Sequence, residues 1–130
     1  MRKAAFAALL SVVSAGVGAQ WVEVDSDETV VVHIDPTAIR RDGDLARMRE
    51  LLDYKTARSR GESRYLSSSA QSEYNCKTVQ ARTLSLSLYA GNMAADGVVH
   101  QSHDPDDWRP VPPGGVLELL WKIACGHGHC

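Results

Sequence analysis

The last six residues of the chain carry its densest set of metal-ligating side chains. Cys125 and Cys130 supply two thiols, and His127 and His129 supply two imidazoles. Thiolates and imidazoles are ligands that zinc and copper favour in proteins. The Cys-Gly-His-Gly-His-Cys spacing is not that of an established zinc module, and its glycines leave the donors without supporting contacts. We keep metal binding through His127, His129 and Cys130 as an alternative function, and we predict no cofactor.

Catalytic residue types occur together in one other stretch. Ser102, His103 and Asp104 are the residue types of a hydrolytic triad, but they are neighbours in sequence, whereas triad members are brought together by the fold. The chain contains no G-x-S-x-G, phosphate-loop or dinucleotide-binding pattern. The acids that precede Trp108 are typical of a solvated loop. The sequence therefore predicts a protein that is not an enzyme.

Three cysteines, Cys76, Cys125 and Cys130, leave three single disulfide pairings open. We favour Cys76–Cys125, because this bond ties the middle of the chain to its end. It closes a loop of about 50 residues, and the chain-entropy model assigns such a cross-link roughly 4 kcal/mol. Cys130 would then be left to form an intermolecular bond or to stay reduced. A disulfide is expected in a small exported domain.

The first 19 residues have the three parts of a signal peptide. Arg2 and Lys3 form a positive start, an apolar stretch covers residues 4–13, and residues 17–19 fit the small-residue rule for a cleavage site. The apolar stretch is shorter than the ~20 residues of a membrane-spanning helix, and no other stretch is long enough. Gln20 stands where a lipoprotein signal has cysteine. We expect residues 20–130 to form one domain, periplasmic or secreted and not lipid-anchored.

Positive charge is concentrated in one segment of an otherwise acidic domain. Without its first two basic residues the chain has 12 basic and 16 acidic side chains, a balance that argues against nucleic-acid binding. Residues 40–64, in contrast, carry a net charge of +3. This segment is either a solvated face of mixed charge or a strip that binds an acidic partner such as a sulfated glycan. The candidate ligand-binding residues are Arg40, Arg41, Arg58, Arg60 and Arg64.

Patterns of β-branched and alternating residues predict a sheet. Strands are expected over residues 21–24, 29–34, 45–56, 83–89 and 98–101, with weak alternation over 64–74. The acidic residues 25–28 are typical of a turn, and Asp42-Gly43 is typical of a β-hairpin turn. Residues 36–39 are expected to form a short helical turn. For residues 45–56 a helix is the competing interpretation, and we prefer a strand because the turn before it requires an antiparallel partner.

The end of the domain predicts a helix. Apolar residues at 116, 117, 120, 121 and 124 form one stripe at helical spacing, and Gly126 is a typical stop. A helix of this length is marginal alone and needs a sheet to pack against. The elements together predict an α+β fold: a small antiparallel β-sheet with a C-terminal α-helix packed on one face and tethered by a disulfide.

Short motifs occur in a defined order along this domain. They include Leu51-Leu52-Asp53-Tyr54-Lys55, Glu73-Tyr74-Asn75-Cys76 and Gly91-Asn92-Met93. Others lie in residues 31–35, 39–43, 65–68, 108–114 and 120–125. Taken in this order, the motifs resemble those of the bacterial surface-adhesin protein E family, over nearly all of residues 20–130.

The resemblance implies an antiparallel sheet whose C-terminal helix is tethered by a disulfide. It also implies adhesion to host matrix proteins such as vitronectin and laminin, and assembly as a homodimer. We therefore expect an exported, non-enzymatic binding domain whose partner is a host extracellular-matrix protein or a sulfated glycan, with no nucleic acid and no membrane span. One alternative is a periplasmic envelope protein of the same fold without adhesin activity.

Overall fold

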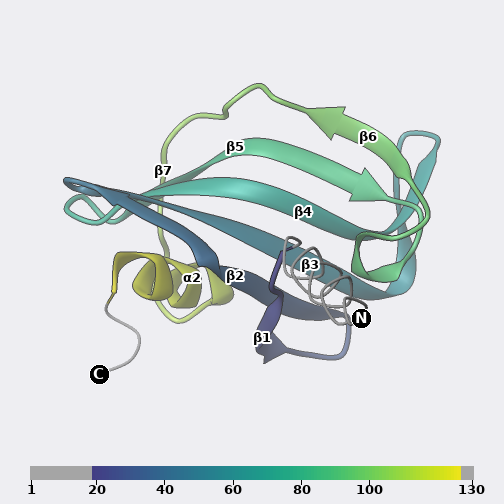
Figure 1. Cartoon of the computed structure of the whole chain (residues 1–130), viewed down its shortest axis with the longest axis horizontal. Helices are drawn as coiled ribbons and strands as arrows, with labels where there is room; N and C mark the ends of the chain where they lie inside the picture. Colours follow the sequence, from purple (N-terminus) through teal and green to yellow (C-terminus); the bar gives the residue numbers. More distant parts are fainter. Residues whose placement is uncertain (1–18, 127–130) are drawn as a thin grey trace, which may run out of the picture.

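The computed structural model describes residues 19–126 and shows a curved antiparallel sheet with an α-helix packed against it (Figure 1). The strands lie in the order β1-β2-β3-β4-β5-β6, so each pairs with its neighbours in sequence, and the short β7 pairs with β5. The strand bounds are β1 Val22–Ser26, β2 Val30–Asp42, β3 Leu45–Arg60, β4 Ser63–Asn75, β5 Gln80–Tyr89, β6 Val98–Ser102 and β7 Arg109–Pro110. A 3-10 turn, η1 (Asn92–Ala94), precedes β6, and α2 (Val116–Cys125) follows β7. The predicted α+β fold is confirmed.

Turn-forming residues join the strands at the predicted places. The Asp27 carboxylate accepts hydrogen bonds from the N–H groups of Thr29 and Val30, which closes the acidic turn between β1 and β2. Gly43 has a φ of 61° at the β2–β3 hairpin, the left-handed conformation that an Asp-Gly hairpin turn requires. The strand that follows, β3, is 16 residues long. The strand interpretation of residues 45–56 is therefore confirmed over the competing helix.

The predicted helical turn at residues 36–39 is wrong, because β2 extends through this segment. The register between β2 and β3 shifts between Asp35 and Arg40, so the segment bulges from the ladder. The Asp35 carboxylate accepts hydrogen bonds from the N–H and the hydroxyl of Thr37 inside the bulge. Pro36 marks this bulge, because a proline cannot donate to a ladder and is tolerated in a sheet only at such irregular places.

The hydrophobic core lies between one face of the sheet and α2. Its buried side chains include Val32, Ile34, Ala46, Met48 and Tyr74 from the sheet, and Leu120 and Ala124 from α2. Strand alternation places the residues next to these on the opposite face. The helix ends at Gly126, whose φ of 84° lets the chain turn away. The helix predicted for residues 116–124 is thus confirmed, with one further residue.

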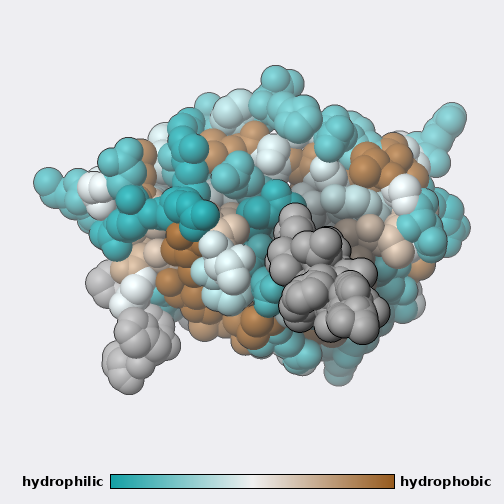
Figure 2. Space-filling view, viewed as in Figure 1, coloured by the Kyte–Doolittle hydropathy of each residue, from teal (hydrophilic) through white to brown (hydrophobic). Residues whose placement is uncertain are grey.

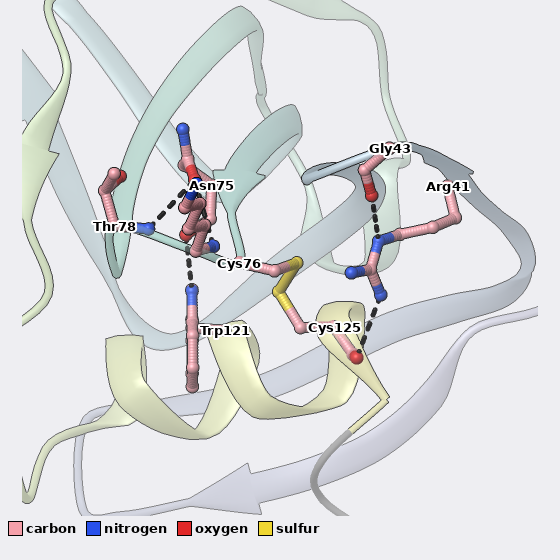
Figure 3. Close-up of a disulfide and its surroundings, with 8 residues drawn as sticks. Arg41, Gly43, Asn75, Cys76, Thr78, Trp121 and Cys125 are labelled. Atoms are coloured by element: carbon pink, nitrogen blue, oxygen red, sulfur yellow. Dashed lines mark hydrogen bonds between the residues drawn. A yellow bond between two sulfur atoms is a disulfide. The ribbon is translucent and has the colours of Figure 1, made fainter.

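A disulfide between Cys76 and Cys125 ties the end of α2 to the segment after β4, so the favoured pairing is confirmed (Figure 3). Beside it, Nη1 of Arg41 donates to the carbonyl oxygen of Cys125 at 3.1 Å. The indole Nε1 of Trp121 donates to the carbonyl oxygen of Asn75 at 3.0 Å. The helix is therefore held to the sheet by a covalent bond and two hydrogen bonds in addition to core packing.

Two sequence predictions concern segments outside the described residues. They are the signal peptide, apart from Ala19, and the metal-ligating tail with His127, His129 and Cys130. Across residues 19–126, none of the helices has the length and apolar character of a membrane crossing. In the same range, no three His, Cys, Asp or Glu side chains are grouped so that they could hold a metal ion.

Candidate binding surface

The five candidate arginines lie in two groups, at opposite ends of β3 (Figure 1). Arg40 and Arg41 are beside the β2–β3 hairpin, close to α2, whereas Arg58, Arg60 and Arg64 are at the β3–β4 hairpin. Twelve strand positions separate the β3 partner of Arg41 from Arg58, which is about 40 Å at ~3.3 Å per residue. The five arginines therefore do not form one strip, because the long strand carries the chain from one end of the sheet to the other.

Arg40 and Arg41 are engaged in local hydrogen bonds. Arg40 donates to the carbonyl oxygens of Thr37 and Ile39, inside the bulge of β2. Arg41 donates to the carbonyl oxygen of Cys125 at the end of α2. These contacts give both arginines a local structural role. The candidate binding surface is therefore centred on the other three.

Two tyrosines lie next to Arg58. Its guanidinium carbon is 4.9 Å from the ring centroid of Tyr54. The Tyr54 ring meets the ring of Tyr65 edge to face, with centroids 5.7 Å apart. Arg58, Arg60 and Arg64 are exposed, and none of them forms a salt bridge within the described part of the chain. The Arg58 guanidinium thus lies over one aromatic ring, and all three arginines lack a salt-bridge partner among the described residues.

The loop between β5 and β6 folds against the same end of the sheet. Nδ2 of Asn92 donates to Oδ1 of Asp53 and to the carbonyl oxygen of Tyr54, both at 2.9 Å. The N–H of Met93 donates to the same Asp53 oxygen. The loop is therefore tied to β3 at the point where Tyr54 contributes to the surface.

The backbone of this loop is strained. Met93, Ala94 and Asp96 have φ values of 56°, 61° and 65°, a conformation that costs a non-glycine residue of order 1 kcal/mol. Gly91 is closely packed, since a Cβ there would lie 2.3 Å from the Asp96 carboxylate and 3.2 Å from the carbonyl oxygen of Ala95. Such strain persists only where surrounding contacts enforce it. The hydrogen bonds to β3 do so here, and they fix the position of the Met93 backbone.

Exposed apolar side chains complete the surface. Met93, Val98 and Val99 are 44%, 50% and 37% exposed. The hydroxyl of Ser63 donates to the carbonyl oxygen of Val99 at 3.4 Å, so the β3–β4 hairpin reaches β6. Figure 2 shows a small hydrophobic area among hydrophilic residues at this end of the molecule. We call the following set the hairpin-end surface: Tyr54, Arg58, Arg60, Arg64, Tyr65, Met93, Val98 and Val99.

The composition of the hairpin-end surface is that of a protein-binding patch. Arginine, tyrosine and methionine are enriched in interfaces, and tyrosine and arginine are frequent binding hot spots. The arginines follow from the sequence prediction, but the tyrosines and the strained loop do not. One sequence signal for the aromatic contact is the spacing of Tyr54 and Arg58, since residues four apart on a strand share a face.

Replacing Asn92 with alanine is expected to loosen the loop over residues 91–97. The substitution removes the amide donor to Asp53 and Tyr54, and net contributions of ~1 kcal/mol per hydrogen bond predict a loss of about 1–2 kcal/mol. Urea unfolding and amide hydrogen exchange of the loop measure the effect. Met93→Ala is the control, because it keeps the backbone N–H bond to Asp53. Equal stability of the two variants would contradict this account of the loop.

A second charged cluster becomes apparent only from the strand register. Arg47, Glu73 and Arg82 are cross-strand neighbours on β3, β4 and β5. The carboxylate of Glu73, which is 2% exposed, is 3.1 Å from Nε of Arg47 and 2.9 Å from Nη2 of Arg82. The guanidinium of Arg82 also lies 4.7 Å from the ring of Trp108. We assign this cluster a structural role, because both arginines neutralise one buried acid.

The triad-type residues remain consecutive at the end of β6. Ser102 is the last residue of the strand, and its Oγ accepts a hydrogen bond from the N–H of Asp104 at 3.3 Å. His103 and Asp104 are exposed in the loop that follows. The serine oxygen is thus used as an acceptor for the loop backbone, which is the ordinary role of a serine at a strand end.

The chain is similar to known proteins both in sequence pattern and in fold. The family model for surface-adhesin protein E matches residues 21–126. Crystal form II of Haemophilus influenzae protein E has a TM-score of 0.60 at 11% identity, covering 84% of this chain and 99% of that chain. Another structure of that protein has a TM-score of 0.58 at 11% identity, covering 85% and 97%. Its selenomethionine form gives 0.58 at 10% identity, covering 84% and 95%. The comparison with curated proteins gives no match. At such identities, the structural likeness concerns the fold alone.

Proposed function

The chain belongs to the surface-adhesin protein E family, and on this premise we propose that it is an exported, non-enzymatic binding domain. Its hairpin-end surface holds an acidic extracellular partner, either a host extracellular-matrix protein or a sulfated glycan. Membership of an adhesin family supports the binding role. The observation that carries the choice of surface is the grouping of Arg58, Arg60 and Arg64 at one hairpin, with the Arg58 guanidinium over the Tyr54 ring and no salt bridge to any of the three among the described residues.

The Cys76–Cys125 bond supports the compartment in this proposal. Disulfides form and persist in the periplasm and outside the cell, and are rare in the reducing cytosol. In the proposed protein, residues 1–19 are removed as a signal peptide. The mature chain, residues 20–130, is then periplasmic or secreted without a lipid anchor, and it acts as a homodimer.

Binding of the mature chain to immobilised vitronectin, laminin and heparin tests the proposal directly. Saturable binding that weakens between low and high salt is the expected result, because exposed charges are screened over about 10 Å at 0.1 M salt. Heparin binding alone would identify the partner as a glycan. Absence of binding to all three at micromolar protein would contradict adhesion and favour an envelope protein of the same fold.

A charge-matched pair of triple variants locates the surface. Replacing Arg58, Arg60 and Arg64 with serine is expected to weaken binding at least tenfold, equivalent to about 1.4 kcal/mol. The control replaces Arg40, Lys77 and Lys122, which are exposed elsewhere and give the same change in net charge. If both triple variants weaken binding equally, net charge alone explains the attraction and the hairpin-end surface is not the site.

A further inference from the structure

A pocket of about 200 Å³ lies between the helix-covered face of the sheet, α2 and β7. Its apolar lining includes Leu52 of β3, Leu86 of β5 and Leu117 of α2. Its polar lining includes Glu50 and Tyr74. The volume corresponds to roughly seven water-sized groups at ~30 Å³ each. The pocket is separate from the hairpin-end surface, since none of the residues of that surface lines it.

Glu50 presents its carboxyl group in this pocket. The residue is 8% exposed, and its Oε1 accepts a hydrogen bond from the Ser72 hydroxyl at 2.9 Å. Its other oxygen accepts a hydrogen bond from the hydroxyl of Tyr74. A carboxylate has about four acceptor sites, so two remain after these bonds. Burial raises the pKa of Glu50 to about 7, because desolvation outweighs both hydrogen bonds.

Two arginines line the pocket near Glu50 and each is paired with another acid, while the charge of Arg109 also favours the ionised form of Glu50. Arg109 of β7 lines the pocket, and its Nη1 pairs with Asp106 at 3.2 Å. Arg82 of β5 also lines the pocket, and its guanidinium pairs with Glu73. Within residues 19–126, no salt bridge includes Glu50. A buried carboxylate is ordinarily paired with a cation, and here the pocket has room for one.

We propose that this pocket binds a small organic cation, a primary ammonium on a short apolar chain. The ammonium donates hydrogen bonds to the free acceptor sites of Glu50, and the apolar chain packs on Leu52, Leu86 and Leu117. An anion of the same size would meet the Glu50 carboxylate, while the guanidinium groups of Arg82 and Arg109 in the lining are paired with Glu73 and Asp106. A neutral alcohol lacks the positive charge that the buried acid requires.

Titration of the mature chain with n-butylammonium, followed by amide chemical shifts, tests this site. Millimolar or tighter binding with shifts at residues 50, 72 and 86 is expected, and butyrate and n-butanol should bind at least tenfold more weakly. Binding is also expected to be more than tenfold tighter at pH 8 than at pH 5.5, as Glu50 loses its proton. The titratable and charged groups that face Glu50 from neighbouring elements are Tyr74 of β4, Arg82 of β5 and Arg109 of β7, and burial raises the pKa of Tyr74, so its hydroxyl stays protonated over this range.

Two variants and a control separate this site from non-specific attraction. Glu50→Gln should weaken n-butylammonium binding at least tenfold, whereas Glu62→Gln, an exposed acid at the β3–β4 turn, should leave it unchanged. Ala70→Leu keeps Glu50 but fills the pocket that Ala70 lines, so it should block binding even if Glu50→Gln does not fold. Equal binding of n-butylammonium and butyrate, or full binding by Ala70→Leu, would overturn the proposal.

Discussion

Replacing both Cys76 and Cys125 with serine will lower the free energy of unfolding by about 4 kcal/mol. The bond spans 49 residues of sequence, and the chain-entropy model for a closed loop of this length supplies the estimate. For a domain of this size, such a loss lowers the melting temperature by roughly 15–25 °C. Since small domains are stable by only ~5–15 kcal/mol, the double variant will be partly unfolded under mild denaturing conditions. Thermal unfolding followed by circular dichroism measures the shift.

The control for the disulfide is Cys130→Ser, which removes a thiol and leaves the Cys76–Cys125 bond in place. Its melting temperature should match that of the wild-type chain. Adding a strong reductant should lower the melting temperature of the wild type to that of the double variant, and should leave the double variant unchanged. A double variant as stable as the wild type would show that α2 is held by core packing and the hydrogen bonds of Arg41 and Trp121 alone.

Glu50→Gln is expected to change how stability depends on pH. The pKa of Glu50 is about 7 in the folded chain, against an ordinary value of 4.5. Between these two values the folded state keeps a proton that the unfolded state has released, so raising the pH favours unfolding by about 1.4 kcal/mol per pH unit. The contribution of Glu50 is fully present below pH 4.5, and about 3 kcal/mol of it is lost by the time the pH passes 7. Glutamine does not ionise and escapes this loss.

Urea unfolding of the wild type and Glu50→Gln at pH 5, 6, 7 and 8 measures the difference. The stability of Glu50→Gln relative to the wild type should rise with pH by up to about 3 kcal/mol and become level above pH 7. Glu62→Gln, which changes an exposed acid, should run parallel to the wild type. Apart from residues 50 and 62, the three proteins have the same carboxyl groups, so the comparison isolates the substituted position. Parallel curves for Glu50→Gln and the wild type would contradict a buried, protonated Glu50.

Local sequence patterns predicted the architecture well. The Asp42-Gly43 turn indicated the β2–β3 hairpin, and the stripe of apolar residues from Val116 to Ala124 indicated α2. These predictions are correct because one turn or one helical face is encoded by residues close together in sequence. The Cys76–Cys125 pairing was predicted as the favoured one of three possible pairings. In the structure, the packing of α2 on the sheet brings the two cysteines together.

The residues that meet in the candidate sites could not be predicted from local sequence patterns alone. Residues 40–64 look like one basic segment, but the length of β3 separates its two ends. Glu50 and Tyr74 are 24 residues apart and meet only because Ala46 is paired with Tyr74, which sets the register of β3 against β4. The strained loop around Met93 likewise depends on Asp53, from a different strand. Strand register and the packing of distant segments decide these contacts, and neither can be read from spacing along the chain.

The strand order has a consequence for the kinetics of folding. Each strand from β2 to β6 pairs with the strand that precedes it in sequence, so most of the sheet can grow by short loop closures of low entropic cost. The exceptions are β7, which pairs with β5, and α2, which is the last described element and packs on β2, β3 and β4. We therefore expect a folding stage in which most of the sheet has formed before α2 packs on it. We expect closure by the helix, followed by oxidation of the two thiols, to be the late step of folding.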